Sequence, residues 1–131
     1  MERGRIDNLV LDSRDPDAIA PFWCELLGVE IADRLADGQF VELAAPPDGG
    51  IPLIIQRVPE AKTVKNRLHV DVEVADLEEA TREVERLGGR WRDREEHEDH
   101  GYRWRVMADP EGNEFCIFPA AHETAESRRP S

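Results

Sequence analysis

Hydrophobic and polar positions along the chain follow two different periods, and the same succession of periods occurs twice. Residues 6–12 alternate as in a strand and are followed by a helical pattern that ends at Leu27. Residues 67–73 alternate in the same way before a second helical pattern that ends at Leu87. The two segments align at an offset of 61 positions, which matches Asn8 with His69. The pattern indicates an internal duplication.

One amphipathic helix is predicted in each repeat. In the first, Asp15 suits the N-cap and Pro16 the first helical position, and one face is apolar: Ile19, Phe22, Trp23, Leu26 and Leu27. This spacing favours a core role for Trp23 over contact with a ligand. In the second helix, Asp76 and Glu79 have the spacing of a capping box.

Further strands are predicted from short apolar runs bounded by turn residues, at 29–34, 39–44, 52–58, 89–92, 102–108 and 114–118. The charged segment 92–101 is expected to form a mobile loop. The order is therefore βαβββ twice, in an α+β fold. We expect a single domain over residues 5–119, followed by a flexible tail. Its parts are module one at 5–58, a connector at 59–66, module two at 67–119 and the tail at 120–131.

Three segments resemble the vicinal-oxygen-chelate superfamily, which includes glyoxalases, extradiol dioxygenases and bleomycin-resistance proteins. They are Asp15–Gly28 with its Phe-Trp and Leu-Leu-Gly pairs, Lys65–Asp71, and Met107–Cys116 with its Asp-Pro-Glu-Gly-Asn turn. The chain is most similar to the small glyoxalase-like domains common in actinobacteria. The resemblance implies two βαβββ modules that form a cupped mixed sheet around a cavity, with the helices outside. It also implies a homodimer.

Metal-using members of this superfamily carry His or Glu at four positions, and the resemblance places those positions at Asn8, Gln56, His69 and Cys116. The neutral amides of Asn8 and Gln56 are weak donors for a divalent metal. We therefore expect no resident cofactor, with His69 as a hydrogen-bonded pocket residue. A divalent metal held by His69 is the alternative.

Other candidate site residues come from strand alternation. If Val41 faces the helix, Phe40 and Glu42 face the opposite side, where Glu42 would serve as a general base or pair with an amine, or would simply be exposed. Tyr102 and Trp104 share a face, and we expect them to line a ligand pocket with Phe40, Asn8, Gln56 and Cys116.

The segment His97–His100 holds two histidines beside carboxylates. A solvated loop is the favoured interpretation, and a metal site or a lid over the cavity are the alternatives.

Composition narrows the class of protein. The chain has 131 residues and a formal net charge of −12, and it shows no basic patch of the kind that nucleic acid requires. Its apolar runs are far shorter than the ~20 residues of a membrane span. Two cysteines cannot build a disulfide framework, and the start of the chain lacks a signal-peptide core, so a cytoplasmic location is expected.

Three functions remain open at this point. The leading hypothesis is a glyoxalase-like protein with a degenerate metal site that binds and sequesters an aromatic or cationic small molecule. The alternative is a vicinal-oxygen-chelate enzyme of lyase, isomerase or dioxygenase type. It would use His69 with a divalent metal or as an acid or base, assisted by Glu42 or Cys116. A third hypothesis is a domain for dimerisation or partner binding.

Overall fold

The computed structural model describes residues 3–119, so the predicted tail lies outside the described residues. The chain divides into two compact units, Met1–Lys62 and Thr63–Ser131. Neither helix of the described range is long and apolar enough to cross a membrane.

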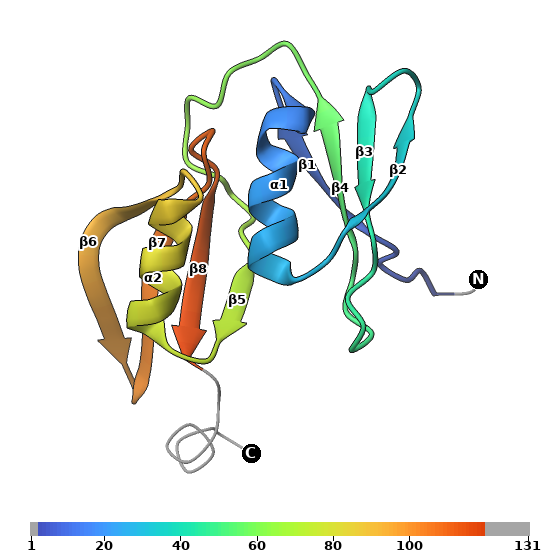
Figure 1. Cartoon of the computed structure of the whole chain (residues 1–131). Helices are drawn as coiled ribbons and strands as arrows, with labels where there is room; N and C mark the ends of the chain where they lie inside the picture. Colours follow the sequence, from blue (N-terminus) through green and yellow to red (C-terminus); the bar gives the residue numbers. More distant parts are fainter. Residues whose placement is uncertain (1–2, 120–131) are drawn as a thin grey trace. The chain divides into compact units, whose positions relative to one another are not determined.

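The first unit is a βαβββ module (Figure 1). Its elements are β1 (Leu9–Ser13), α1 (Pro16–Leu27), β2 (Ile31–Leu35), β3 (Phe40–Leu43) and β4 (Leu53–Arg57). The sheet order is β1-β4-β3-β2; β1 runs parallel to β4, and the other neighbours are antiparallel.

The second unit repeats this topology with the sheet order β5-β8-β7-β6. Its elements are β5 (Asp71–Val74), α2 (Leu77–Arg86), β6 (Arg90–Asp99), β7 (Tyr102–Ala108) and β8 (Glu114–Pro119). The two mixed four-stranded sheets, each with one helix, confirm the α+β class and the repeated βαβββ order.

Both helices begin at the predicted residues, but different hydrogen bonds hold the two N-termini. At α2, Asp76 Oδ1 accepts a hydrogen bond from the Glu79 amide at 2.9 Å, which confirms the capping interaction. At α1, Asp15 occupies the N-cap before Pro16, and its own amide donates to Ser13 Oγ at 2.9 Å. Ser13 therefore ties the end of β1 to the start of α1.

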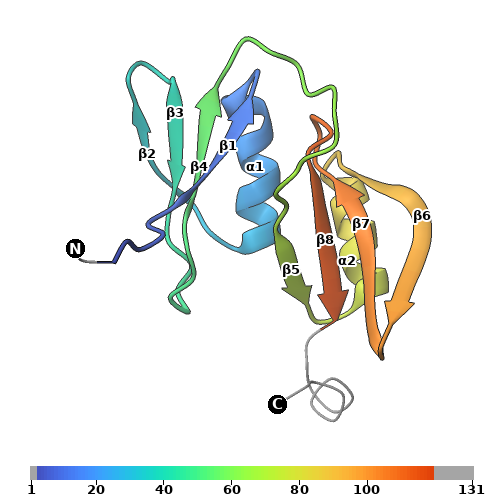
Figure 2. The same cartoon turned by 180° about the vertical axis from the view of Figure 1, so that it is seen from behind.

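Each sheet has one face covered by its own helix and an opposite face, which we call the helix-free face. Figure 2 shows the second unit from that side, with its strands in front of α2. The covered faces form the core, with Val41, Leu43, Ile55, Met107, Phe115 and Ile117 almost fully buried. Phe22 and Trp23 pack edge to face at 5.3 Å within that core, which confirms the structural role expected for Trp23.

The prediction of a loop over 92–101 is wrong, because β6 runs through Asp99 and pairs with β7. The turn between the two strands is only His100-Gly101. Charged side chains are compatible with this strand because cross-strand partners neutralise them. Glu96, for example, accepts from Arg103 Nε at 2.8 Å. The lid hypothesis for this segment loses its basis.

The register of β6 against β7 is broken by a bulge between Trp91 and Glu96. From Trp91 to Glu96 the chain advances five residues, while their partners in β7 are only two residues apart. Residues 92–95 are therefore extra residues without a partner in β7, and they form the bulge. Arg94 takes the left-handed conformation there, with φ +58°. The Trp91 indole donates to the Glu95 carbonyl at 3.1 Å, and Asp93 accepts from the Glu95 amide at 3.0 Å, so the bulge is internally hydrogen-bonded.

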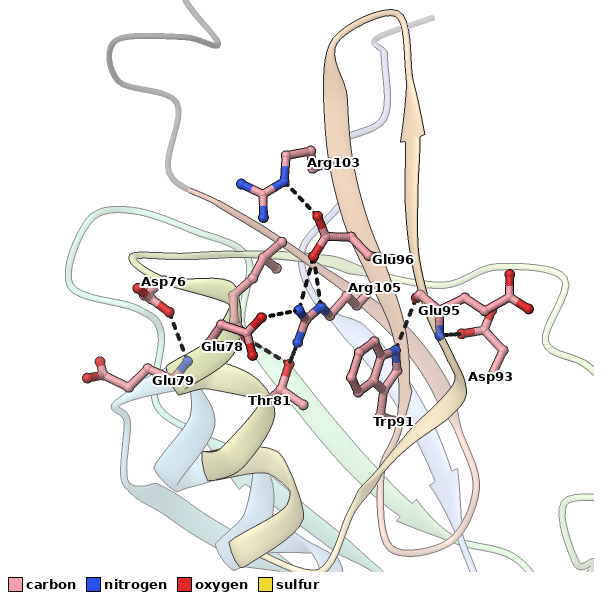
Figure 3. A network of polar contacts seen from close by, with 11 residues as sticks. Asp76, Glu78, Glu79, Thr81, Trp91, Asp93, Glu95, Glu96, Arg103 and Arg105 are labelled. Atoms are coloured by element: carbon pink, nitrogen blue, oxygen red, sulfur yellow. Dashed lines mark hydrogen bonds and ion pairs between the residues drawn. The ribbon is translucent and has the colours of Figure 1, made fainter.

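The covered side of β6 and β7 is held to α2 by one buried cation (Figure 3). Arg105 is 3% exposed and donates to Thr81 Oγ1 at 2.8 Å, as well as to the carboxylates of Glu78 and Glu96. Its guanidinium also lies over the Trp91 ring, 4.1 Å from the centroid. This network fixes the edge strand that carries His97.

Candidate functional site

Three side chains with metal-ligating atoms meet on the helix-free face of the second unit. The ligand atoms of His69, Asp71 and Cys116 all lie within 4.8 Å of one another. His69 Nε2 and Asp71 Oδ1 are 3.2 Å apart. The His69 and Asp71 side chains are exposed, by 43% and 61%, and Cys116 is partly buried.

The sheet register explains this meeting. β5 runs parallel to β8 with Asp71 opposite Cys116, and the Cys116 amide donates to the Val70 carbonyl at 3.0 Å. His69 precedes β5 and lies two residues before Asp71 in the sequence. The resemblance had given His69 and Cys116 as ligand positions, but it did not give Asp71 as one. The alternation of His69 and Asp71 was the available signal.

The surroundings keep Cys116 protonated at neutral pH. Burial, followed by the nearby Asp71 carboxylate, raises the pKa of the Cys116 thiol to about 11, and Lys65 only partly opposes this. A metal ion would reverse this balance, because a coordinating thiol gives up its proton to the cation's charge.

A histidine–carboxylate pair lies on the same side of the second sheet. His97 Nε2 is 2.7 Å from Asp93 Oδ2, and the imidazole stacks on the Trp104 ring at 5.5 Å with an interplanar angle of 17°. Burial alone would raise the pKa of Asp93, but hydrogen bonds from the Glu95 amide and from His97 outweigh it and lower that pKa. Sequence reasoning missed Asp93, because only the bulge turns it toward His97.

The predicted aromatic residues of the second unit fall on this side as well. Tyr102, Trp104 and Val106 occupy every second position of β7 and so share one face of the sheet. Val106 is the partner of Cys116 in β8. Trp104 pairs with His97 and Tyr102 with Asp99. The helix-free face therefore runs from His69 and Asp71 over Cys116 and Val106 to Trp104 and His97.

The candidates of the first unit share the helix-free face of their own sheet. Phe40 pairs with Gln56, and Glu42 pairs with Ile54, while the intervening Val41 is buried on the helix side. This agrees with the alternation expected for Phe40 and Glu42.

Asn8 lies just before β1, and its side-chain Nδ2 donates to Asp7 Oδ2 at 3.0 Å. In the first sheet, Gln56 pairs with Asp12, which lies four residues after Asn8. In the second sheet, Cys116 pairs with Asp71, which lies only two residues after His69. The first-sheet residue in the register of Cys116 is therefore Ile54, an apolar side chain. The three-donor cluster has no such counterpart among the described residues of the first unit.

Solved structures with the same fold are similar over nearly the whole chain. A manganese complex of an E126Q mutant of the fosfomycin resistance protein FosX from Listeria monocytogenes is 14% identical, covers 98% of each chain and has a TM-score of 0.74. A bleomycin-binding protein from Streptomyces verticillus, complexed with copper(II)-bleomycin, is 23% identical over 92% of this chain and 99% of that one, with a TM-score of 0.60. A glyoxalase/bleomycin resistance protein/dioxygenase family enzyme from Burkholderia phytofirmans is 16% identical over 87% and 97%, with a TM-score of 0.71. At these identities the likeness shows the fold alone.

No curated protein matches the sequence significantly. The family model described as "Glyoxalase-like domain" matches residues 8–118, a range that includes every element from β1 to β7 and most of β8. This match and the solved structures confirm the resemblance to the vicinal-oxygen-chelate superfamily. The chain belongs to the glyoxalase-like domain family.

Proposed function

We propose that this chain is a cytoplasmic small-molecule-binding protein whose ligand site is the helix-free face of the second sheet, centred on a divalent metal held by His69, Asp71 and Cys116. One observation carries the proposal, namely that the ligand atoms of these three side chains lie within 4.8 Å of one another. The sequence favoured a site without metal because only one family ligand was recognised. Asp71 supplies the third donor that this interpretation lacked.

The donor set suits a particular kind of metal. One imidazole nitrogen, one carboxylate oxygen and one thiolate sulfur are the ligand types of zinc, whereas Mg²⁺ and Ca²⁺ prefer oxygen alone. Three protein ligands leave a coordination position for water or a ligand atom. When bound, the metal would supply Lewis-acid polarisation of that ligand.

Two similar proteins support the small-molecule part of the proposal. One was solved with manganese and 1S,2S-dihydroxypropylphosphonic acid, and the other with copper(II)-bleomycin. The aromatic residues Trp104 and Tyr102, on the same face as the cluster, suit a ligand with an apolar or planar part. Net charge −12 makes a strongly anionic ligand a poor candidate.

An enzyme of lyase or dioxygenase type is the second candidate function. The observation in its favour is the same three-ligand arrangement, because catalytic zinc sites also use three protein ligands and one open position. Glu42, proposed as a base from the sequence, lies in the first unit, and within the second unit His97 is a further histidine with an orienting carboxylate, outside the three-donor cluster.

The protein purified without tag or chelator is expected to bind about one zinc ion per chain. Substituting His69→Ala or Cys116→Ser should weaken that binding by at least about tenfold. Because the Cys116 pKa is about 11, binding below that pH must release the thiol proton. Zinc affinity should therefore rise about tenfold for each pH unit. Elemental analysis and competition with a chromogenic chelator measure both quantities.

His100→Ala is the matched control, since His100 is highly exposed and lies at the β6–β7 turn. It should leave zinc binding unchanged. In Cys116→Asp the contribution of the thiol proton to the pH slope should disappear, because an aspartate is already ionised. Equal zinc content in wild type and His69→Ala, or none in either after zinc is added, would refute the metal site.

We also expect a homodimer in solution, by analogy with the superfamily. Size-exclusion chromatography with light scattering at micromolar concentration should report about twice the chain mass of 14.9 kDa. A mass equal to that of one chain would refute the dimer without affecting the metal site.

A further inference from the structure

His97 has the setting of a proton acceptor rather than of a solvated surface histidine. Its side chain is 32% exposed, and its ring is held both by Trp104 below it and by Asp93 at one nitrogen. His100, three residues along the chain, is 86% exposed and lies 3.6 Å from its nearest carboxylate.

The hydrogen bond to Asp93 selects the tautomer of the neutral imidazole. Since the Asp93 carboxylate is ionised and can only accept, Nε2 of His97 must carry the hydrogen and donate it. Nδ1 is then the nitrogen with a free lone pair, and no described residue is bonded to it. An orienting carboxylate of this kind also stabilises the imidazolium that forms when Nδ1 takes a proton.

The bulge in β6 brings Asp93 and His97 together. The bulge adds residues 92–95 to β6 and places Arg94 in the left-handed conformation. That conformation costs free energy in a residue other than glycine. Without the bulge, Asp93 would take a regular strand position instead of lying at 2.7 Å from His97. Bulges of this sort re-aim side chains beside functional sites.

The distance from this pair to the metal cluster suits a small molecule. His97 pairs with Trp104 and Cys116 with Val106, so two strand spacings and two residues along β7, roughly 12 Å in all, separate them. Val106 and Trp104 of β7 lie between them, and the Asp93 carboxylate is near enough to help raise the pKa of the Cys116 thiol. Charged groups on this side also include the ion pair of Arg92 with Glu114, beside Cys116, and Asp99 lies with Tyr102 at the turn end.

We infer that His97, positioned by Asp93 against Trp104, accepts the proton of a small planar weak acid, a phenol or an N–H heterocycle, bound on this face. The ligand arrives neutral, which suits an acidic protein. Its O–H or N–H bond gives the proton to Nδ1, and the resulting anion stays beside the imidazolium. The inference rests on the proposed small-molecule site but does not require the metal.

The test uses metal-free full-length protein and 4-nitrophenol, a chromogenic acid whose acidity is close to that of an imidazolium. Absorbance of bound nitrophenolate against pH should show the pKa of the probe lowered by about one unit in the wild type, a tenfold stronger acid. His97→Phe keeps a ring over Trp104 but removes Nδ1, and it should abolish the shift. His100→Gln should retain the shift in full.

Asp93→Asn tests the positioning role by a property that a structural role alone would not change. Nitrogen chemical shifts of His97 should report the Nε2–H tautomer in the wild type and a mixture in Asp93→Asn, with a smaller shift of the probe. Absence of probe binding to the wild type, or an equal pKa of the bound probe in wild type and His97→Phe, would overturn the inference. Because the protein is metal-free, these outcomes are independent of the zinc measurements.

Discussion

Arg105→Ala is expected to lower the free energy of unfolding by about 3 kcal/mol, because it removes a buried charge that several groups have been arranged to satisfy. The guanidinium donates to Thr81 at 2.8 Å, to Glu78 at 2.6 Å and to Glu96 at 3.0 Å (Figure 3). Its loss leaves the buried Thr81 hydroxyl with fewer partners and opens a cavity beside Trp91. Chemical denaturation measures the difference.

Arg103→Ala is the matched control, since Arg103 lies on the same strand and also donates to Glu96, but its side chain is 45% exposed. It should cost less than about 1 kcal/mol. Equal losses for the two variants would show that burial of Arg105 contributes nothing beyond an exposed ion pair.

The effect of Arg105→Ala should also depend on pH. The hydrogen bond from Arg103, then the contacts with Arg105, lower the pKa of Glu96 against the opposing effect of burial. A lowered folded-state pKa means that this stabilisation is present above the unfolded pKa and is lost as pH falls through the folded pKa. The gap between wild type and Arg105→Ala should therefore narrow below about pH 4.

Asp109→Ala is the second substitution with a large expected cost, again about 3 kcal/mol. Asp109 is 1% exposed, and its carboxylate accepts three hydrogen bonds at 2.9 Å, from the amide of Glu111 and from the amide and side chain of Asn113. Alanine would leave those buried donors unpaired in the turn between β7 and β8. Thermal or chemical unfolding measures the loss.

Asp48→Ala gives the comparison for a turn carboxylate outside the core. Asp48 is exposed and accepts from the Gly50 amide at 3.2 Å. Its removal should change stability by no more than about 0.5 kcal/mol. If Asp109→Ala were equally mild, the turn would be held by its backbone alone.

The Asp109 result bears on how the family was recognised. The Asp-Pro-Glu-Gly-Asn segment is the motif most specific to the superfamily, yet in the structure its residues stabilise a tight turn. Gly112 at φ +93° donates to the Asp109 carbonyl there, a conformation that favours glycine. The motif therefore identifies the fold, while the chemistry depends on residues outside it.

Sequence patterns predicted the repeated βαβββ order and the two helices. The hydrophobic periodicity of these elements is strong, and the residues that cap each helix are neighbours in the sequence. They misjudged β6, where charged residues form a strand because Arg103 and Arg105 of the neighbouring strand neutralise them. That support depends on the pairing of β6 with the next strand, which a pattern read within one segment does not contain.

The candidate site could be predicted only in part, for a similar reason. His69 and Cys116 followed from the resemblance, and the shared face of Tyr102 and Trp104 followed from alternation. The role of Asp71 depends on the register of β5 against β8, and that of Asp93 depends on a bulge. Neither register nor bulge has a reliable signal in one sequence.

The charge on β6 affects the tendency of the protein to aggregate. β6 is an edge strand, and eight of its ten residues carry a formal charge, with a kink in the middle. An edge strand exposes backbone groups to which another chain can add, and charged side chains and bulges discourage that addition. The features that aim Asp93 at His97 thus also protect this edge from intermolecular β-sheet growth and aggregation.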